Sequence, residues 1–186
     1  GGSALAELNG DVRAILRETA PGGAWTFPAA HWRWIGPLKP EMQSDWDACQ
    51  RLRRAGFIVI GRANMTEFAY SGIGINPHFG TPKSVWNRSV GHVPGGSSSG
   101  AAVSIADQMA YGALGTDTGG SCRIPAAYNG NVGYKPTQAR VPLDGGVPLS
   151  SSLDSFGPLA RTVSCCAVLD AVLANEAVQP LQPRPV

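Results

Sequence analysis

The stretch GGSSSGAAVSIADQMAYGALGTDTGGSCRIPAA, residues 95–127, places seven glycines and five serines in two clusters joined by an apolar run. The small apolar residues at 101–110 predict a helix that can pack closely on its neighbours. The segment YGALG, at 111–115, then predicts a short buried strand. A helix followed by a strand in this order would hold the two glycine-serine clusters in register with one another.

The sequence on both sides of this stretch alternates short helices with short strands. Strands are predicted at 57–61 (FIVIG) and at 131–137. Helices are predicted at 46–55, with Asp45 as N-cap and Gly56 as stop, at 64–70, and at 163–174 after the cap Thr162. The alternation indicates an α/β fold.

Composition and charge place the chain among ordinary globular domains. Apolar residues make up 43% and charged residues 15% of the 186 residues, and the formal net charge is +2. The one tight basic group, Arg51, Arg53 and Arg54, is interpreted as the solvated side of a helix, so no nucleic-acid partner is expected. No apolar run reaches the roughly 18 residues of a membrane span, so no membrane partner is expected either.

The four cysteines lack the spacing of a disulfide framework or a metal cage. Two of them are adjacent, Cys165 and Cys166, and no CxxC or HxxxH spacing occurs. We therefore expect reduced thiols, a cytoplasmic location, no metal ion and no other cofactor.

The two clusters admit three kinds of catalytic chemistry. Ser98 lies in a G-x-S-x-G pattern like that of α/β-hydrolases, but their histidine follows the serine, and all three histidines here precede it. The triplet 117–119, Asp-Thr-Gly, resembles that of aspartic proteases, which need two such carboxylates, and the chain has no second triplet. A serine can instead be activated by a lysine of lowered pKa, while nearby glycines leave backbone N–H groups free to bind an oxyanion. This third chemistry explains why glycine and serine recur in two places.

These motifs resemble the signature of the amidase signature family, serine hydrolases that cleave carboxylic amides with a Ser-cisSer-Lys triad. GGSSSG at 95–100, GTDTGGSCRIPAA at 115–127 and NGNVGYKPT at 129–137 follow that family's order and spacing. RLRRAGFIVIGRANMTEFAYSGIGINPHFGTP at 51–82 is also similar, so the resemblance covers about residues 46–175. It implies an α/β amidase-signature core, a mixed β-sheet flanked by helices, that is incomplete in this chain.

The resemblance implies a role for each residue of the two clusters. Ser121 would be the nucleophile that accepts the acyl group. Ser97, entered through a cis peptide from Gly96, would bridge the nucleophile to the base. Ser98 and Asp117 would be supporting hydrogen-bond partners. The oxyanion hole would be formed by the backbone N–H groups of Thr118, Gly119, Gly120 and Ser121.

The same residues also have structural interpretations. Ser121 could cap a helix, and the serines at 97–99 could be turn hydroxyls. The pair Gly119–Gly120 could serve only a tight turn. Asp117 could instead pair with Arg123. The whole pattern favours the catalytic roles for Ser121 and Ser97 and leaves the role of Asp117 open.

The family's base lysine has no clear counterpart in this sequence. The family carries it far upstream, in an apolar segment of the form G-x-P-x-x-x-K-D, and residues 10–27 here read GDVRAILRETAPGGAWTF. Lys39 lies upstream but between prolines, Lys83 lies in a loop, and Lys135 lies downstream of both serines. We interpret all three as solvated or structural. Arginine cannot replace the base, because its pKa lies above about 12.

We therefore expect an amidase-type serine hydrolase that forms an acyl-enzyme on Ser121 with a small-molecule amide and is poorly active or inactive without the base. The alternatives are the A subunit of a glutamyl-tRNA amidotransferase and a non-catalytic amidase fragment. The short length favours a fragment, a pseudoenzyme or a frameshifted start. The expected organisation is an atypical segment at 1–44, a partial amidase-signature domain at 45–178 and a polar tail at 179–186.

Overall fold

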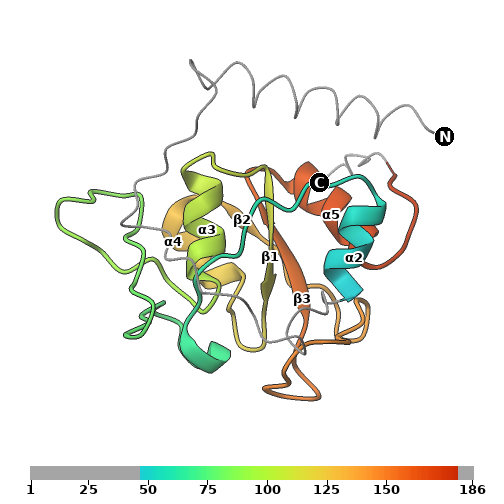
Figure 1. The fold of residues 1–186 in the computed structure, drawn as a ribbon, viewed down its shortest axis with the longest axis horizontal. Helices are drawn as coiled ribbons and strands as arrows, with labels where there is room; N and C mark the ends of the chain where they lie inside the picture. Colours follow the sequence, from blue (N-terminus) through green and yellow to red (C-terminus); the bar gives the residue numbers. More distant parts are fainter. Residues whose placement is uncertain (1–46, 180–186) are drawn as a thin grey trace, which may run out of the picture.

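The computed structural model of the chain describes residues 47–179. The atypical segment expected at 1–44, Lys39, and all but the first residue of the tail expected at 179–186 lie outside the described residues. The described part is arranged in three layers, a central sheet with a pair of helices on each face (Figure 1). This arrangement confirms the α/β class expected from the alternation of elements.

The sheet has the strand order β1-β3-β2. β1 spans Gly112–Thr116, β2 spans Val132–Gly133, and β3 spans Phe156–Ala160. Both pairings are antiparallel, so the two outer strands run in one direction and β3 runs in the other. The strand predicted at 111–115 is thus confirmed with a shift of one residue, whereas the strand predicted at 131–137 is only two residues long.

The central strand β3 is the element that the sequence did not indicate. All five of its residues are buried, yet two of them are Gly157 and Pro158. Proline in an apolar run argues against a central strand, because it cannot donate to the ladder. Here the strand persists because apolar side chains cover both faces of the sheet.

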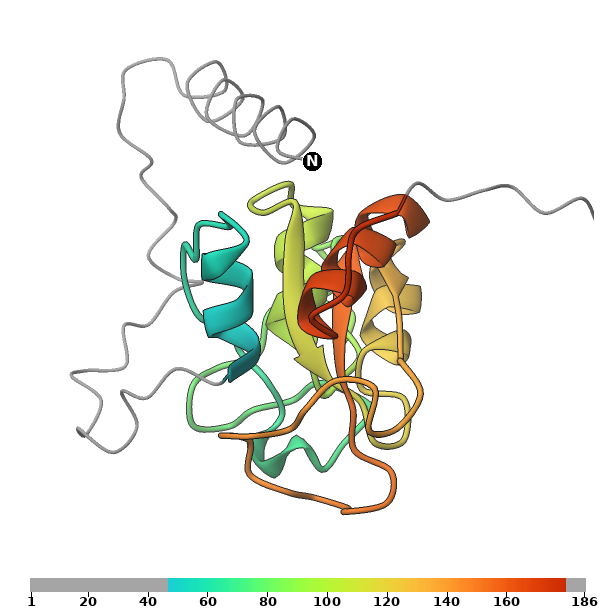
Figure 2. The same ribbon diagram turned by 90° about the vertical axis from the view of Figure 1, so that its right-hand side faces the viewer.

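Two helices cover each face of the sheet (Figure 2). α3, Ser99–Ala106, and α4, Arg123–Asn129, lie on one face, and α2, Asp47–Arg54, and α5, Val163–Leu173, lie on the other. The helices predicted at 46–55 and 163–174 are confirmed, and the Thr162 side chain accepts a hydrogen bond from Cys165 N at 3.1 Å as the expected cap.

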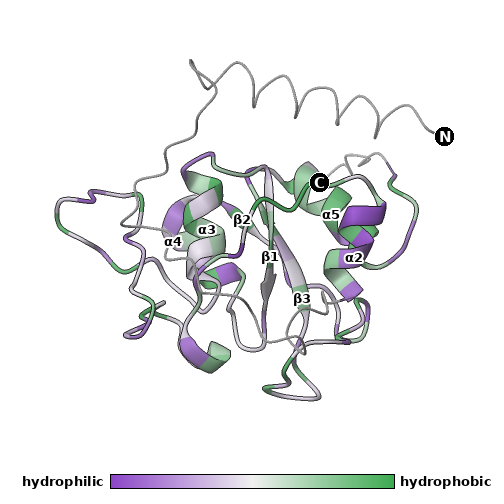
Figure 3. Cartoon of the chain, viewed as in Figure 1, coloured by the Kyte–Doolittle hydropathy of each residue, from purple (hydrophilic) through white to green (hydrophobic). Residues whose placement is uncertain are grey.

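The basic group on α2 is only partly the solvated face that the sequence predicts. Arg53 and Arg54 are exposed. Arg51 is half-buried, and its Nη1 donates to Leu173 O at 2.8 Å, which ties the helix to the end of α5. Figure 3 shows the difference between the two partners, since α5 is largely hydrophobic and α2 presents hydrophilic residues.

Two predictions between α2 and α3 are wrong for the described structure. Residues 57–61 form no strand, and Ile58, Val59 and Ile60 are 56%, 43% and 59% exposed. A strand needs a neighbouring backbone and a covering layer; within 47–179 the segment pairs with no strand, and only Phe57 packs against the core. The helix predicted at 64–70 is reduced to a single 3-10 turn, η2, Glu67–Ala69.

The core between the sheet and the α3–α4 pair is built from small side chains. It consists of Ala101, Ala102, Ile105, Cys122, Ala126 and Leu159. Small side chains let α3 approach the sheet closely, as the composition of 101–110 predicted. Among residues 47–179, no helix combines the length and hydrophobicity required to cross a membrane.

Replacing Leu159 by alanine should test this core. Leu159 is completely buried at the centre of β3, so Leu159→Ala should lower the free energy of unfolding by about 2–5 kcal/mol. Leu153→Ala is the matched control, because Leu153 is 54% exposed and its truncation should change stability by less than about 0.5 kcal/mol. Urea titration measures both values, and equal losses in the two variants would contradict this assignment of the core.

Candidate active site

The two glycine-serine clusters lie against each other where α3 begins and β1 ends. Ser98 N donates to Ser121 O at 3.1 Å. The Ser98 hydroxyl accepts from Thr116 N at 3.3 Å and donates to Thr116 O at 3.4 Å. A Cβ atom at Gly115 would lie 2.7 Å from this hydroxyl, so a side chain there would displace it. Ser98 therefore acts as the supporting partner that joins the two clusters.

Ser97 is completely buried, and its peptide bond to Gly96 is cis, as the resemblance implied. Its carbonyl oxygen accepts from Thr66 N at 3.0 Å and Ser99 N at 2.8 Å. Its hydroxyl, in contrast, has no hydrogen-bond partner among residues 47–179. Buried hydroxyls without a partner are rare in folded proteins, and such a group needs an explanation.

Ser121 lies at a pocket of about 250 Å³. Its residue is 8% exposed, so the serine is buried but reaches the pocket surface. The nine lining residues come from three separate segments of the chain. They are Ala69, Tyr70, Ser71, Gly72, Thr118, Gly119, Ser121, Ile124 and Leu149.

Asp117 organises the turn that carries Ser121. Its completely buried carboxylate accepts from Gly120 N at 2.7 Å and Cys122 N at 3.0 Å. Arg123 adds two further bonds at 3.0 Å, from Nε and from Nη2, which confirms the pairing considered from the sequence. Burial by itself would raise the pKa of Asp117, but the hydrogen bonds from Arg123 and from the two amides outweigh it and hold that pKa below its usual value.

Of the four amides expected at the oxyanion hole, one already donates a hydrogen bond within the turn and three do not. The Gly120 amide donates to Asp117 Oδ1, so the prediction that it is a free donor is wrong. The N–H groups of Thr118, Gly119 and Ser121 have no acceptor among residues 47–179. Three of the four amides are thus free to bind a developing negative charge.

Gly119 and Gly120 lack a side chain for different structural reasons. Gly120 has φ +132°, a conformation that disfavours any side chain, so the tight-turn interpretation holds for it. Gly119 has no such φ, and a Cβ atom added there would meet nothing within 4 Å. Because Gly119 also lines the pocket, its missing side chain leaves room for a ligand.

Lys135 is a structural residue, as its position downstream of both serines indicated. Its ammonium donates to Asp117 O at 2.7 Å, to Leu153 O at 2.6 Å and to Ser155 Oγ at 2.9 Å. These three acceptors use all three of its protons. Lys135 therefore joins the start of the Ser121 turn to the loop that precedes β3.

Asp154 makes a second connection between the same two segments, and the sequence did not indicate it. Thr118 Oγ1 donates to Asp154 Oδ1, and Asp154 Oδ2 accepts from Leu149 N at 2.8 Å and Ser150 N at 2.9 Å. Burial alone would raise the pKa of Asp154, but these three hydrogen bonds lower it on balance. No motif surrounds Asp154, so only its spatial neighbours reveal its role.

Other candidate nucleophiles and bases lie away from the pocket. Neither His78 nor His92 lines it, and His31 lies outside the described residues. Cys122 follows Ser121 but is completely buried behind the turn, and burial together with the charge of Asp117 raises its pKa far above the usual value. No group of three His, Cys, Asp or Glu side chains within 47–179 is arranged to hold a metal ion.

Acid should destabilise the fold through Asp117. Its pKa is lower in the folded chain than the ordinary value of 3.8, so its carboxylate stabilises the fold above that value. This contribution is lost as the pH falls through the folded-state pKa. In urea titrations from neutral pH to about pH 3, Asp117→Asn should be less stable at neutral pH by about 2 kcal/mol and should lose less stability on acidification.

The matched control for this experiment is Asp144→Asn. Asp144 is exposed, and no hydrogen bond involves its side chain among the described residues. Its replacement should leave the pH profile unchanged. An Asp117→Asn profile parallel to that of the parent chain would show that Asp117 does not contribute to acid sensitivity.

Comparison with known proteins agrees with this geometry. The family described as Amidase matches residues 39–185. The 2-amino-5-chloromuconic acid deaminase of Comamonas testosteroni is 46% identical over 155 residues, which are 83% of this chain and 31% of that protein. The A subunit of the glutamyl-tRNA(Gln) amidotransferase from Ralstonia nicotianae is 46% identical over 131 residues, 70% of this chain and 26% of that protein. The chain thus spans about a third or less of the length of these relatives.

Solved structures show the same relationship. A crystal structure of an amidase superposes with a TM-score of 0.71 at 44% identity and covers 78% of this chain and 33% of that chain. A peptide amidase bound to the inhibitor chymostatin superposes with a TM-score of 0.64 at 40% identity, over 69% of this chain and 27% of that one. The extent of the family match, the sequence identities and the shared fold show that this chain belongs to the amidase signature family.

Proposed function

We propose that this chain carries the nucleophile and the oxyanion hole of an amidase that cleaves a carboxylic amide through an acyl-enzyme on Ser121. One observation carries the proposal. Ser121 lies at an open pocket, in a turn whose Thr118, Gly119 and Ser121 amides have no other acceptor among the described residues. Such preorganised donors are worth about 2.7–4 kcal/mol each to the transition state of acyl transfer.

The reaction would proceed in two halves. Ser121 Oγ attacks the amide carbonyl carbon and loses its proton, and the carbonyl oxygen becomes an anion that the free amides bind. The C–N bond then breaks, and ammonia or an amine leaves with the proton. A water molecule next attacks the ester on Ser121, which releases the carboxylic acid and restores the serine hydroxyl.

Ser97 would carry the proton between Ser121 and a base. Its buried hydroxyl has no partner among residues 47–179, so it is free for this relay. Lys135 cannot be the base, because its three protons are donated to other acceptors. Without a base the reaction lacks a contribution of about 10²–10⁴ to the rate. We therefore propose that the chain by itself is a poor catalyst.

A second candidate is the A subunit of a glutamyl-tRNA amidotransferase, because relatives of that kind are as similar as the deaminase. That function would require partner subunits, so co-purification of such subunits would favour it. A small-molecule amidase would purify without them. For either enzyme we infer a reducing compartment such as the cytoplasm, since the four cysteines are all free thiols.

A fluorophosphonate probe should form a covalent adduct with Ser121, slowly because the chain lacks the base, since the free amides of the turn would still stabilise the negative charge that develops during the attack. Intact-mass spectrometry should show one adduct on the full chain and none on Ser121→Ala. Ser97→Ala should react more slowly than the parent chain, since the hydroxyl that would accept the proton of Ser121 is lost. Ser152→Ala is the control, because Ser152 is exposed and lies outside the pocket, and it should react like the parent chain.

The outcomes of this experiment separate the hypotheses. An unlabelled parent chain would indicate a non-catalytic member of the family. Hydrolysis of small amides at ordinary enzymatic rates, abolished by Ser121→Ala, would contradict the proposal that the chain lacks an effective base.

Gly119→Ala should separate the ligand-binding role of this turn from its structural role. Its methyl group would project into open space, so stability should change by less than about 0.5 kcal/mol, but labelling of Ser121 should fall about tenfold or more. Gly120→Ala should instead destabilise the fold, because φ at this position is +132°. Urea titration and labelling rates measure the two effects, and unchanged labelling of Gly119→Ala would exclude a ligand beside Gly119.

A further inference from the structure

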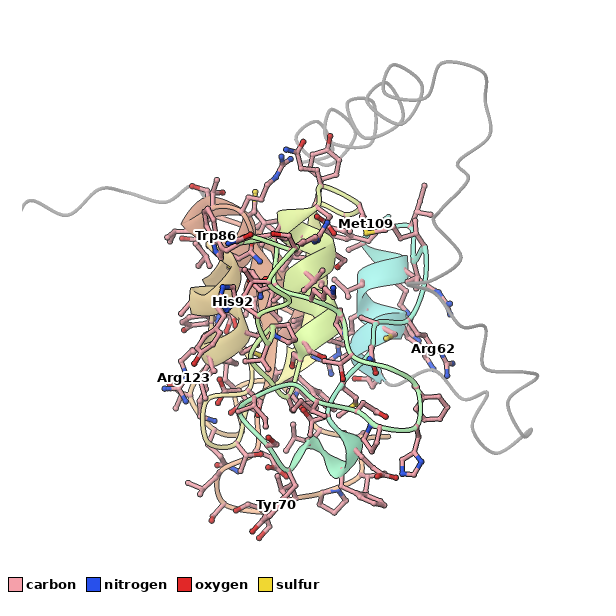
Figure 4. All side chains as sticks on the ribbon, turned by 90° about the vertical axis from the view of Figure 1, so that its left-hand side faces the viewer. Arg62, Tyr70, Trp86, His92, Met109 and Arg123 are labelled. Atoms are coloured by element: carbon pink, nitrogen blue, oxygen red, sulfur yellow. The ribbon has the colours of Figure 1, made fainter. Side chains whose placement is uncertain are left out.

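The loop at 64–81 lies between the pocket and the buried residue Ser97. Residues 69–72 of this loop line the pocket beside Ser121. Figure 4 shows Tyr70 of the loop at the outer edge of the molecule, beyond the end of α3. On its other side, the loop is hydrogen-bonded to the segment that carries Ser97. The loop therefore forms part of the surroundings of both serines.

Two backbone hydrogen bonds hold the Ser97 segment against this loop. Thr66 N donates to Ser97 O at 3.0 Å. Gly96 N donates to Gly72 O at 2.8 Å. The two backbones are in close contact, because a Cβ atom at Gly96 would lie 2.6 Å from Gly74 N. Since Ser97 and Thr66 are both buried, the position of the Ser97 backbone depends on the position of the loop.

Asn76 connects the two ends of the loop. The residue is buried, with 4% of its surface exposed. Its side-chain Oδ1 accepts from His78 N and Phe79 N, each at 3.0 Å. Its Nδ2 donates to Met65 O at 2.8 Å. One side chain therefore joins a turn late in the loop to the beginning of the loop.

The oxygen that Asn76 binds belongs to the same peptide unit as the N–H group that binds Ser97. Met65 C=O and Thr66 N–H lie in one plane and point in opposite directions, because this peptide bond is trans. A donor that fixes the direction of the oxygen also fixes the direction of the N–H group. Two hydrogen bonds in series also polarise the peptide unit between them and strengthen each other. Asn76 thus acts on the Ser97 carbonyl through a single peptide.

We propose that Asn76 is a positioning residue for the reaction and acts on Ser97 through the peptide between Met65 and Thr66. The inference rests on the proposed function, because Ser97 is the residue that would accept the proton of Ser121. The Ser97 hydroxyl has no hydrogen-bond partner among residues 47–179, so the backbone contacts of Ser97 determine where this hydroxyl lies. A shift of that backbone would move the hydroxyl relative to the proton it would accept.

Hydrogen exchange, measured by NMR on the full chain, tests the contact itself. In Asn76→Ala and in Asn76→Asp, the Thr66 amide should exchange at least about tenfold faster relative to the amides of β3. Asn76→Asp keeps an acceptor for the two amides of the turn but lacks the donor to Met65 O, so it separates the two roles of the side chain. Thr81→Val is the control. It removes the acceptor of Asn76 N and leaves the bond to Met65 O, so Thr66 exchange should change by less than about twofold.

The rate at which the fluorophosphonate probe labels Ser121 tests the role in the reaction. Asn76→Ala and Asn76→Asp should each slow labelling by about threefold or more, and neither should be slower than Ser97→Ala. In the Ser97→Ala background, Asn76→Ala should slow labelling no further, because the hydroxyl through which it acts is already absent. A purely structural effect would add to that of Ser97→Ala. Leu173→Ala, which truncates a buried residue of α5, controls for lost stability and should leave the labelling rate of the folded chain unchanged.

Each result decides the proposal. Thr66 exchange that is unchanged in both Asn76 variants would overturn it, and so would faster exchange combined with an unchanged labelling rate. Additive slowing in the double variant would show that Asn76 does not act through Ser97. A parent chain that is never labelled, but whose Thr66 amide exchanges faster in both variants, would retain the contact between Asn76 and the Ser97 segment and lose the proposed function.

Discussion

The turn that carries Ser121 depends on the buried carboxylate of Asp117. The turn contains several backbone N–H groups that no backbone carbonyl accepts, and buried N–H groups need a hydrogen-bond partner. Asp117 provides such a partner, and Arg123 balances its charge at the surface. The carboxylate accepts the Gly120 and Cys122 amides, while the Thr118, Gly119 and Ser121 amides have no acceptor among the described residues, so the N–H groups that hold the turn differ from those that remain available to a ligand.

Two loops remote in sequence stabilise this turn from the other side. Lys135 bonds to the carbonyl of Asp117 and to the segment that leads into β3, and Asp154 bonds to the side chain of Thr118. The loop that carries Leu149 is therefore fixed relative to Ser121, although 28 positions separate the two residues along the chain. One set of hydrogen bonds thus positions both the Ser121 turn and the Leu149 wall of the pocket.

The apolar segment 57–61 is exposed at Ile58, Val59 and Ile60 in the described part of the chain. Its three large aliphatic residues face solvent on both sides, while the helices and the sheet around Ser121 are well covered. The relatives are about three to four times longer than the region they share with this chain. Within residues 47–179, the pocket at Ser121 is shaped by residues 69–72, by the turn between β1 and α4 and by the loop before β3.

The sequence alone determined the family resemblance and the α/β class, because these depend on residues close together in an unusual pattern, and it offered the pairing of Asp117 with Arg123 as one of two alternatives. It also predicted α2, α3 and α5, whose apolar periods and caps are local signals. It could not identify β3, since proline and glycine interrupt its apolar run, and it wrongly assigned a buried strand to 57–61. Only the tertiary structure decided which amides of the turn are free, what Asp154 and Lys135 bind, and which side chains form the pocket. Those properties depend on contacts between distant segments, and the spacing of residues along a chain does not record how its loops meet in space.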